Sequence, residues 1–190
     1  MCLMIDLDGF KKINDTFGHA AGDQVLVETC NALSTIVRRS DTVIRWGGDE
    51  FLVLARSTGR NSAHILAERI RETISGLKVR IDDDRTARVG CSLGYAFYPF
   101  LPSAPKLMAW EQVLKVADRA LYMAKASGKD AWVGISGEEC ARRPALLENL
   151  LADPESLFRE GAVAVASNLP LDELWAAEHR SSAGSGTGAA

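Results

Sequence analysis

The hexapeptide WGGDEF at positions 46–51 constrains the fold most strongly, because it sets two glycines and two acids between apolar runs. Residues 42–44 and 51–54 have the β-branched and aromatic content that is typical of strands. Glycine adopts the backbone angles that a tight turn requires and lets a ligand approach the backbone closely. The hexapeptide therefore predicts a β-hairpin whose tip carries Asp49 and Glu50.

The two adjacent acids at this tip have two possible interpretations. An isolated pair is more often a solvent-facing acidic turn. Alternatively, a bound cation keeps both carboxylates ionised despite their mutual repulsion. The second interpretation gains weight from Asp6, which follows an apolar run and precedes Asp8 and Gly9. An Asp at the carboxyl end of a strand, before a glycine and a helix start, is a common ligand-binding position in α/β sheets.

The residues after this strand predict a short helix beginning near Phe10. Asp8 is expected to cap its first turn. The backbone N–H groups of Gly9, Phe10 and Lys11 would then be free to bind phosphate oxygens.

The order of the motifs resembles the GGDEF family of diguanylate cyclases. The matching segments are DLDGFKKIND at 6–15, FGHAAGD at 17–23, RWGGDEF at 45–51, SLGYA at 92–96 and ADRALYMAK at 117–125. The resemblance implies a palm-like fold related to nucleotidyl cyclases and polymerases. It also implies condensation of two GTP molecules into cyclic di-GMP and pyrophosphate, with a homodimer needed for turnover.

The resemblance assigns roles to individual residues. Metal ligands would be Asp6, the Leu7 carbonyl, Asp49 and Glu50, holding two Mg²⁺ (or Mn²⁺) ions per active site. Asp49 and Glu50 would be catalytic, with Asp49 placed to help deprotonate the attacking 3′-hydroxyl. The substrate contacts implied are Phe10, Lys11, Asn14, His19, Asp23, Gly47, Gly48, Lys125 and Lys129.

Several of these positions also have ordinary structural explanations. Asn14 and Asp23 together offer the donor and acceptors that distinguish guanine from adenine. Asp23 could equally cap a helix starting near Gln24. Lys125 could bind triphosphate or offset the dipole at the end of its helix. Lys129 stands where family members more often have arginine, which would weaken a forked phosphate contact to a point charge.

A regulatory site is suggested by Arg38 and Asp41, which match the RxxD product-inhibition motif of the family in its register to Gly47. Arginine offers a planar fork for guanine edges and phosphate. By the same resemblance, Arg69 would be the second arginine of this product-inhibition site. On its own, an RxxD sequence usually marks a solvated helix end.

Hydrophobic periodicity predicts helices over about 22–38, from about Asn61 to Ile74, and from Val113 to about Gly128. Strands are expected at 2–6, 42–46, 51–55, 88–98 and 131–135, with a short strand and acidic loop over 79–88. These elements predict an α/β (α+β) fold in which a central mixed, mainly antiparallel sheet is flanked by helices. The domain is expected to span 1–135, followed by a helical extension of unknown role at 136–180 and a flexible tail at 181–190.

Composition limits the partners and the location. Net charge is −3, which argues against bulk nucleic-acid binding. No apolar run approaches the ~20 residues that span a bilayer, and no secretory signal precedes the first strand. The four scattered cysteines are interpreted as reduced thiols. A cytoplasmic location is therefore expected.

Three functions fit the sequence. The first is an active diguanylate cyclase, since the metal and guanine positions are intact. The second is a weak or inactive domain that serves as a receptor for cyclic di-GMP or GTP. The short N-terminus, which lacks the helix and DxLTGLxNR stretch usual in the family, supports this second function, whereas the intact pair of Asp49 and Glu50 argues against it; the first function is therefore favoured. The third is a regulatory module that acts through the extension.

Overall fold

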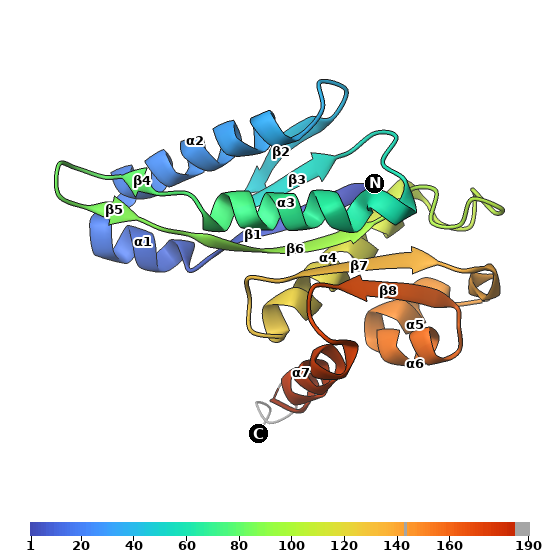
Figure 1. The fold of residues 1–190 in the computed structure, drawn as a ribbon. Coiled ribbons are helices and arrows are strands. Elements are labelled where there is room, and N and C mark those ends of the chain that lie inside the picture. Colours follow the sequence, from blue (N-terminus) through green and yellow to red (C-terminus); the bar gives the residue numbers. More distant parts are fainter. Residues whose placement is uncertain (143, 185–190) are drawn as a thin grey trace.

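The computed structural model describes residues 1–142 and 144–184, and a six-stranded mixed sheet forms its centre (Figure 1). The strand order is β2-β3-β1-β6-β7-β8, and only the β6–β7 pair is parallel. This confirms the predicted mainly antiparallel sheet. The six strands are β1 (Cys2–Asp8), β2 (Thr42–Gly47), β3 (Glu50–Leu54), β6 (Gly90–Ala96), β7 (Trp132–Gly137) and β8 (Val163–Ser167).

Helices cover both faces of the sheet (Figure 1). In β1 the side chains alternate between the two faces, as strand geometry requires. Leu3 and Ile5 pack in the core that includes α2 and α3, whereas Met4 packs in the core that includes α4. The helices are α1 (Phe10–Phe17), α2 (His19–Ile36), α3 (Ala63–Ser75), α4 (Trp110–Ala126), α5 (Leu146–Ala152), α6 (Pro154–Arg159) and α7 (Leu171–Gly184).

Gly94 allows α4 to lie directly on strand β6. A Cβ atom added at Gly94 would stand 2.7 Å from the Cα atom of Leu121 and would also clash with the backbone at Ala117. The absence of a side chain here therefore sets the spacing between α4 and the strands that carry the candidate site.

Some predicted boundaries differ from the observed ones. Helix α2 begins at His19, three residues before its predicted start, because Gly18 is its N-cap. The region 79–88 forms a small hairpin of β4 (Val79–Arg80) and β5 (Thr86–Ala87), closed by the acidic loop. Strand β6 is correspondingly shorter than the expected 88–98.

The region after residue 135 contains a strand that periodicity did not predict. Strand β8 pairs antiparallel with β7 and extends the central sheet. Leu174 and Trp175 of α7 are buried in the same core cluster as the apolar side chains of α4. The helical segments expected here are found as α5, α6 and α7. Helix α7 continues to Gly184, and the rest of the expected tail, 185–190, lies outside the described residues.

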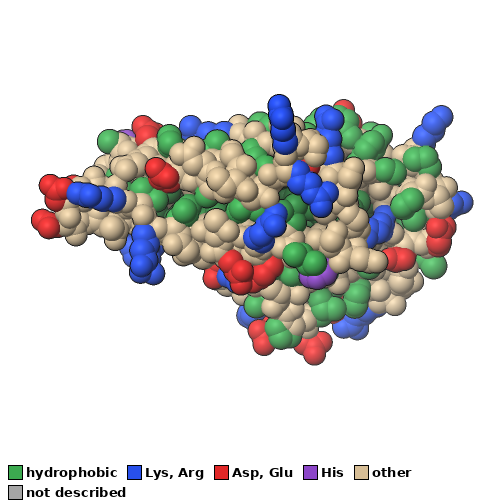
Figure 2. Space-filling model, turned by 45° about the horizontal axis from the view of Figure 1, so that its top comes forward, with side chains coloured by type: hydrophobic (Ala, Val, Ile, Leu, Met, Phe, Trp, Pro, Cys, Tyr) green, Lys and Arg blue, Asp and Glu red, His purple; other side chains and the backbone are tan. Residues whose placement is uncertain are grey.

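Charged side chains are scattered over the face drawn in Figure 2, where acidic and basic groups lie among one another. This distribution agrees with the small net charge. None of the helices within residues 1–142 and 144–184 is both long and apolar enough to cross a membrane.

Candidate active site

The predicted hairpin is formed by β2 and β3 and lies beside the end of β1. Asp6 is paired in register with Glu50, so the two carboxylates lie on the same face of the sheet. The Leu7 N–H donates to the Asp49 carbonyl at 3.3 Å, which ties the hairpin tip to β1. The structure thus brings together all four residues expected to bind metal.

The hairpin tip is held by its own side chains and is open to ligands. Gly48 has a φ of +47°, which a residue with a side chain rarely adopts. Arg45 donates from Nε and Nη2 to the Gly48 carbonyl at 3.0 and 2.8 Å. A Cβ atom added at Gly47 or Gly48 would meet nothing within 4 Å, so a ligand could approach the backbone closely at both glycines.

Lys125 supplies the positive charge of the site. Its Nζ atom lies 2.6 Å from an Asp6 carboxylate oxygen, and the two side chains are only 33% and 14% exposed. Lys125 stands in the last turn of α4, so its charge also opposes the helix dipole. Without ligands, therefore, the lysine predicted to bind triphosphate neutralises a predicted metal ligand.

Burial and crowded charge shift the pKa values of two acids. Burial raises the pKa of Asp6 most; the hydrogen bond and charge of Lys125 oppose this rise, while Asp49 and Asp8 add to it. Burial followed by the negative charge of Asp6 raises the pKa of Glu50. Asp118 of α4 contributes to the same rise, so it belongs to this acidic cluster although the motifs gave no reason to select it.

The oxygen-rich cluster suits a hard divalent cation, because carboxylates and a backbone carbonyl are the ligands such ions prefer. Its geometry is not preformed: among the described residues, no group of three or more His, Cys, Asp or Glu side chains is arranged to hold a metal ion. The Lys125–Asp6 contact is a physical reason, since an ammonium group already bonds one of the candidate ligands.

Asp8 does not cap the helix that follows it, contrary to the sequence-based expectation. Helix α1 has Gly9 as its N-cap, with a φ of +75° and no capping side chain. The Asp8 carboxylate instead accepts bonds from the Ser92 hydroxyl at 3.0 Å and from the Asp130 N–H at 2.9 Å. The first N–H groups of an α-helix lack intrahelical acceptors, so those of Phe10 and Lys11 are suited to phosphate.

The residues expected to recognise guanine lie on α1 and α2, which pack against each other. A Cβ atom at Gly22 would stand 2.9 Å from Asn14 Cγ and 3.1 Å from Phe10 Cζ, so both side chains rest directly on α2. Asp23 follows in the chain and is exposed. The alternative that Asp23 caps a helix is wrong, because α2 starts four residues earlier at His19. Gly22 itself was not selected as a functional residue.

The remaining predicted substrate residues are less constrained. Lys11, His19 and Lys129 are exposed. Phe10 is half-buried and packs against the core, so its side chain has a structural role. Lys129 has a left-handed backbone with φ +70°, in the loop between α4 and β7.

The predicted regulatory residues meet in a surface pocket lined by Arg38, Asp41, Arg69 and residues of α3. The Asp41 carboxylate accepts the backbone N–H groups of Arg38 at 2.9 Å and Arg56 at 2.8 Å. Arg69 donates to the Ile36 carbonyl at 2.6 Å. Asp41 and Arg69 are thus fixed by contacts within the chain.

Comparison with known proteins agrees with this arrangement. The family model "Diguanylate cyclase, GGDEF domain" matches residues 1–131. The chain is 39% identical to diguanylate cyclase A of Treponema denticola over 128 residues. This matched segment makes up 67% of this chain and 33% of that protein. It spans about a quarter to a third of the length of the first curated relatives that it matches.

Two solved structures share the fold. The GGDEF domain of PA1120 from Pseudomonas aeruginosa is 36% identical, with a TM-score of 0.61 over 68% of this chain and 77% of that one. The GGDEF domain of DgcB from Caulobacter crescentus, in complex with c-di-GMP, is 27% identical, with a TM-score of 0.59 over 68% of this chain and 74% of that one. The chain therefore belongs to the GGDEF-domain family of diguanylate cyclases.

Proposed function

We propose that this chain is a diguanylate cyclase that condenses two GTP molecules into cyclic di-GMP and two pyrophosphates. The observation that carries the proposal is the register pair of Asp6 and Glu50 at the hairpin tip, beside the ammonium group of Lys125. Acids and a lysine at one open hairpin suit a substrate that combines a triphosphate with divalent cations. The named relatives and the family support the same chemistry.

The site residues have separable tasks in this proposal. Asp6, Asp49, Glu50 and the Leu7 carbonyl would hold two Mg²⁺ or Mn²⁺ ions, which when bound would neutralise phosphate charge and lower the barrier to attack by the 3′-hydroxyl. Asp49 would also accept the proton of the attacking hydroxyl. Lys125, once released from Asp6, would bind the triphosphate.

Recognition of guanine is assigned to Asn14 and Asp23, with His19 as a further contact. Lys11, Lys129 and the open glycines Gly47 and Gly48 would contact the phosphates, together with the N–H groups at the start of α1. One chain presents one such site, whereas the product joins two GTP molecules. Turnover therefore requires two copies of the domain to face each other.

Product inhibition is assigned to the pocket of Arg38, Asp41 and Arg69. A receptor for cyclic di-GMP is the second candidate function, and the same pocket favours it, because Asp41 and Arg69 are already held in place without ligand. The structure of DgcB with c-di-GMP agrees with binding of this product within the family.

The test is incubation of the purified chain with GTP and Mg²⁺, followed by chromatography for cyclic di-GMP. Asp49→Ala serves as the blank. Product that disappears in this variant supports the cyclase. An absence of product together with binding of cyclic di-GMP that Arg38→Ala abolishes would replace the cyclase with the receptor.

A further inference from the structure

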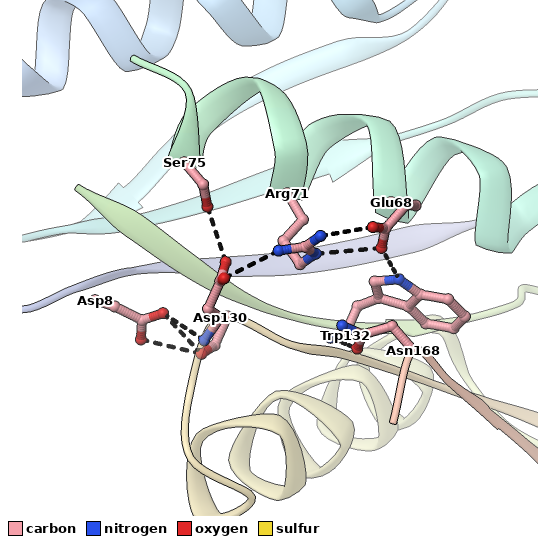
Figure 3. Close-up of polar contacts among 8 residues, drawn as sticks. Asp8, Glu68, Arg71, Ser75, Asp130, Trp132 and Asn168 are labelled. Atoms are coloured by element: carbon pink, nitrogen blue, oxygen red, sulfur yellow. Dashed lines mark hydrogen bonds and ion pairs between the residues drawn. The ribbon is translucent and has the colours of Figure 1, made fainter. Parts of the chain in front are cut away.

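A polar network outside the acidic cluster joins α3, the loop after α4 and the end of β1 (Figure 3). Asp130, in the loop, accepts bonds from Arg71 Nη1 at 3.0 Å and from the Ser75 hydroxyl at 2.8 Å. Its own N–H donates to the Asp8 carboxylate at 2.9 Å. Asp130 thus links α3 to the strand that carries Asp6.

The guanidinium group of Arg71 is also held by a residue other than Asp130. Its side chain is 18% exposed and bonds both oxygens of Glu68, at 2.6 and 3.2 Å. Glu68 also accepts the indole N–H of Trp132 at 2.7 Å. These bonds come from α3 and β7 and hold the guanidinium group in one orientation. The contact with Asp130 therefore costs little further conformational entropy of the Arg71 side chain.

The loop needs such support, because its backbone is strained. Gly128, Lys129 and Asp130 have consecutive φ values of +116°, +70° and +47°. Left-handed backbone is costly for residues with a Cβ atom and persists only where surrounding contacts impose it. The bonds that Asp130 accepts from Arg71 and Ser75, and the bond that its N–H donates to Asp8, are such contacts.

We propose that Arg71 is a positioning residue for phosphate binding, acting through Asp130 to keep Lys129 and the β1–α1 turn together on one side of the site. This role rests on the proposed function, since Lys129 and the N–H groups of α1 are its phosphate contacts. Arg71 itself touches neither. Guanine recognition by α1 and α2 lies outside this network.

The experiment uses three variants: Arg71→Gln, Asp130→Ala and the double variant that combines them. The control is Glu72→Gln, which alters an exposed acid on the same helix as Arg71. Equilibrium dialysis measures the affinity for a non-hydrolysable GTP analogue with Mg²⁺ and, separately, for guanosine. Loss of one charge-assisted contact should weaken analogue binding about tenfold in Arg71→Gln while guanosine binding is unchanged. The double variant should lose no more affinity than Asp130→Ala alone, because each single variant already removes the bond between Arg71 and Asp130.

Amide hydrogen exchange of Asp130, measured without nucleotide, tests by itself whether Arg71 holds the loop through Asp130. Arg71→Gln should accelerate this exchange about tenfold while the amide of Leu93, in the buried strand β6, keeps its protection. Unchanged Asp130 exchange, additive losses in the double variant, or equal losses for guanosine and the analogue would each overturn the proposal. If the unmodified chain fails to bind the analogue, the cyclase proposal fails. The exchange result still decides whether Arg71 holds the loop through Asp130.

Discussion

Substitution of Gly22 by alanine should weaken guanine recognition much more than it weakens the fold. The new Cβ atom would overlap Asn14 Oδ1, and it would lie 2.9 Å from Asn14 Cγ and 3.1 Å from Phe10 Cζ, closer than the 3.5–4.0 Å of a favourable carbon contact. The Asn14 amide ends a short side chain, so it can relieve this overlap by turning to another rotamer. The clash is therefore relieved by moving the residue proposed to bind guanine.

The magnitudes follow from opposing effects. Overpacking costs about 1–3 kcal/mol, and alanine gains about 1 kcal/mol over glycine inside a helix. The free energy of unfolding should therefore fall by at most about 2 kcal/mol, measured by urea denaturation. A lost hydrogen bond to the base costs about 1.5 kcal/mol, which is about tenfold in GTP affinity.

The assay is the ratio of GTP to ATP affinity, measured with non-hydrolysable analogues and Mg²⁺. Gly22→Ala should lower this ratio about tenfold, as should Asn14→Ala, and the double variant should lose no more than Asn14→Ala alone. A ratio that Gly22→Ala leaves unchanged, or losses that add, would show that Asn14 does not recognise the base from this position.

Other predictions concern packing, charge and the C-terminal region. Gly94→Ala should cost about 3 kcal/mol in urea denaturation, because its Cβ atom meets the backbone of α4, which cannot rotate away; a loss below about 1 kcal/mol would contradict this. The raised pKa of Glu50 means that the folded state retains a proton that the unfolded chain releases, so stability should fall as pH rises from 4.5. Glu50→Gln should flatten this fall, and an unchanged pH profile would exclude Glu50 as its source. The side chains of Arg119 and Glu178, 11% and 7% exposed, pair α4 with α7, so Arg119→Met should cost about 3 kcal/mol. A stability equal to that of the unmodified chain would refute the importance of this pair.

Local sequence signals were sufficient for the hairpin that carries Asp49 and Glu50 and for the long helices. The glycines and flanking β-branched residues predicted the β2–β3 hairpin, whereas the approach of Asp6 to Glu50, made by the β1–β3 pairing, was expected from the family resemblance. Apolar periodicity likewise located α3 and α4. The hairpin and the two helices depend on neighbours in the sequence, which explains why they could be predicted without coordinates.

Features created by distant contacts could not be predicted in this way. The strand at 163–167 is rich in alanine and valine, and its pairing with β7 is what makes it a strand. Asp8 was expected to cap α1, but Gly9 is the N-cap residue. The Asp8 carboxylate instead accepts hydrogen bonds from Ser92 and from the N–H of Asp130.

The Lys125–Asp6 pair joins residues more than a hundred positions apart. Periodicity could only place Lys125 at a helix end, so its partner was outside the reach of sequence patterns.

The stoichiometry and concentration dependence of turnover test the central claim most directly. The chain at increasing concentration is incubated with GTP and Mg²⁺, and cyclic di-GMP and pyrophosphate are both quantified. The account predicts two pyrophosphates per cyclic di-GMP, a rate per chain that rises with concentration because two sites must meet, and no product from Glu50→Gln. Failure to form cyclic di-GMP at every concentration, while GTP still binds, would contradict it.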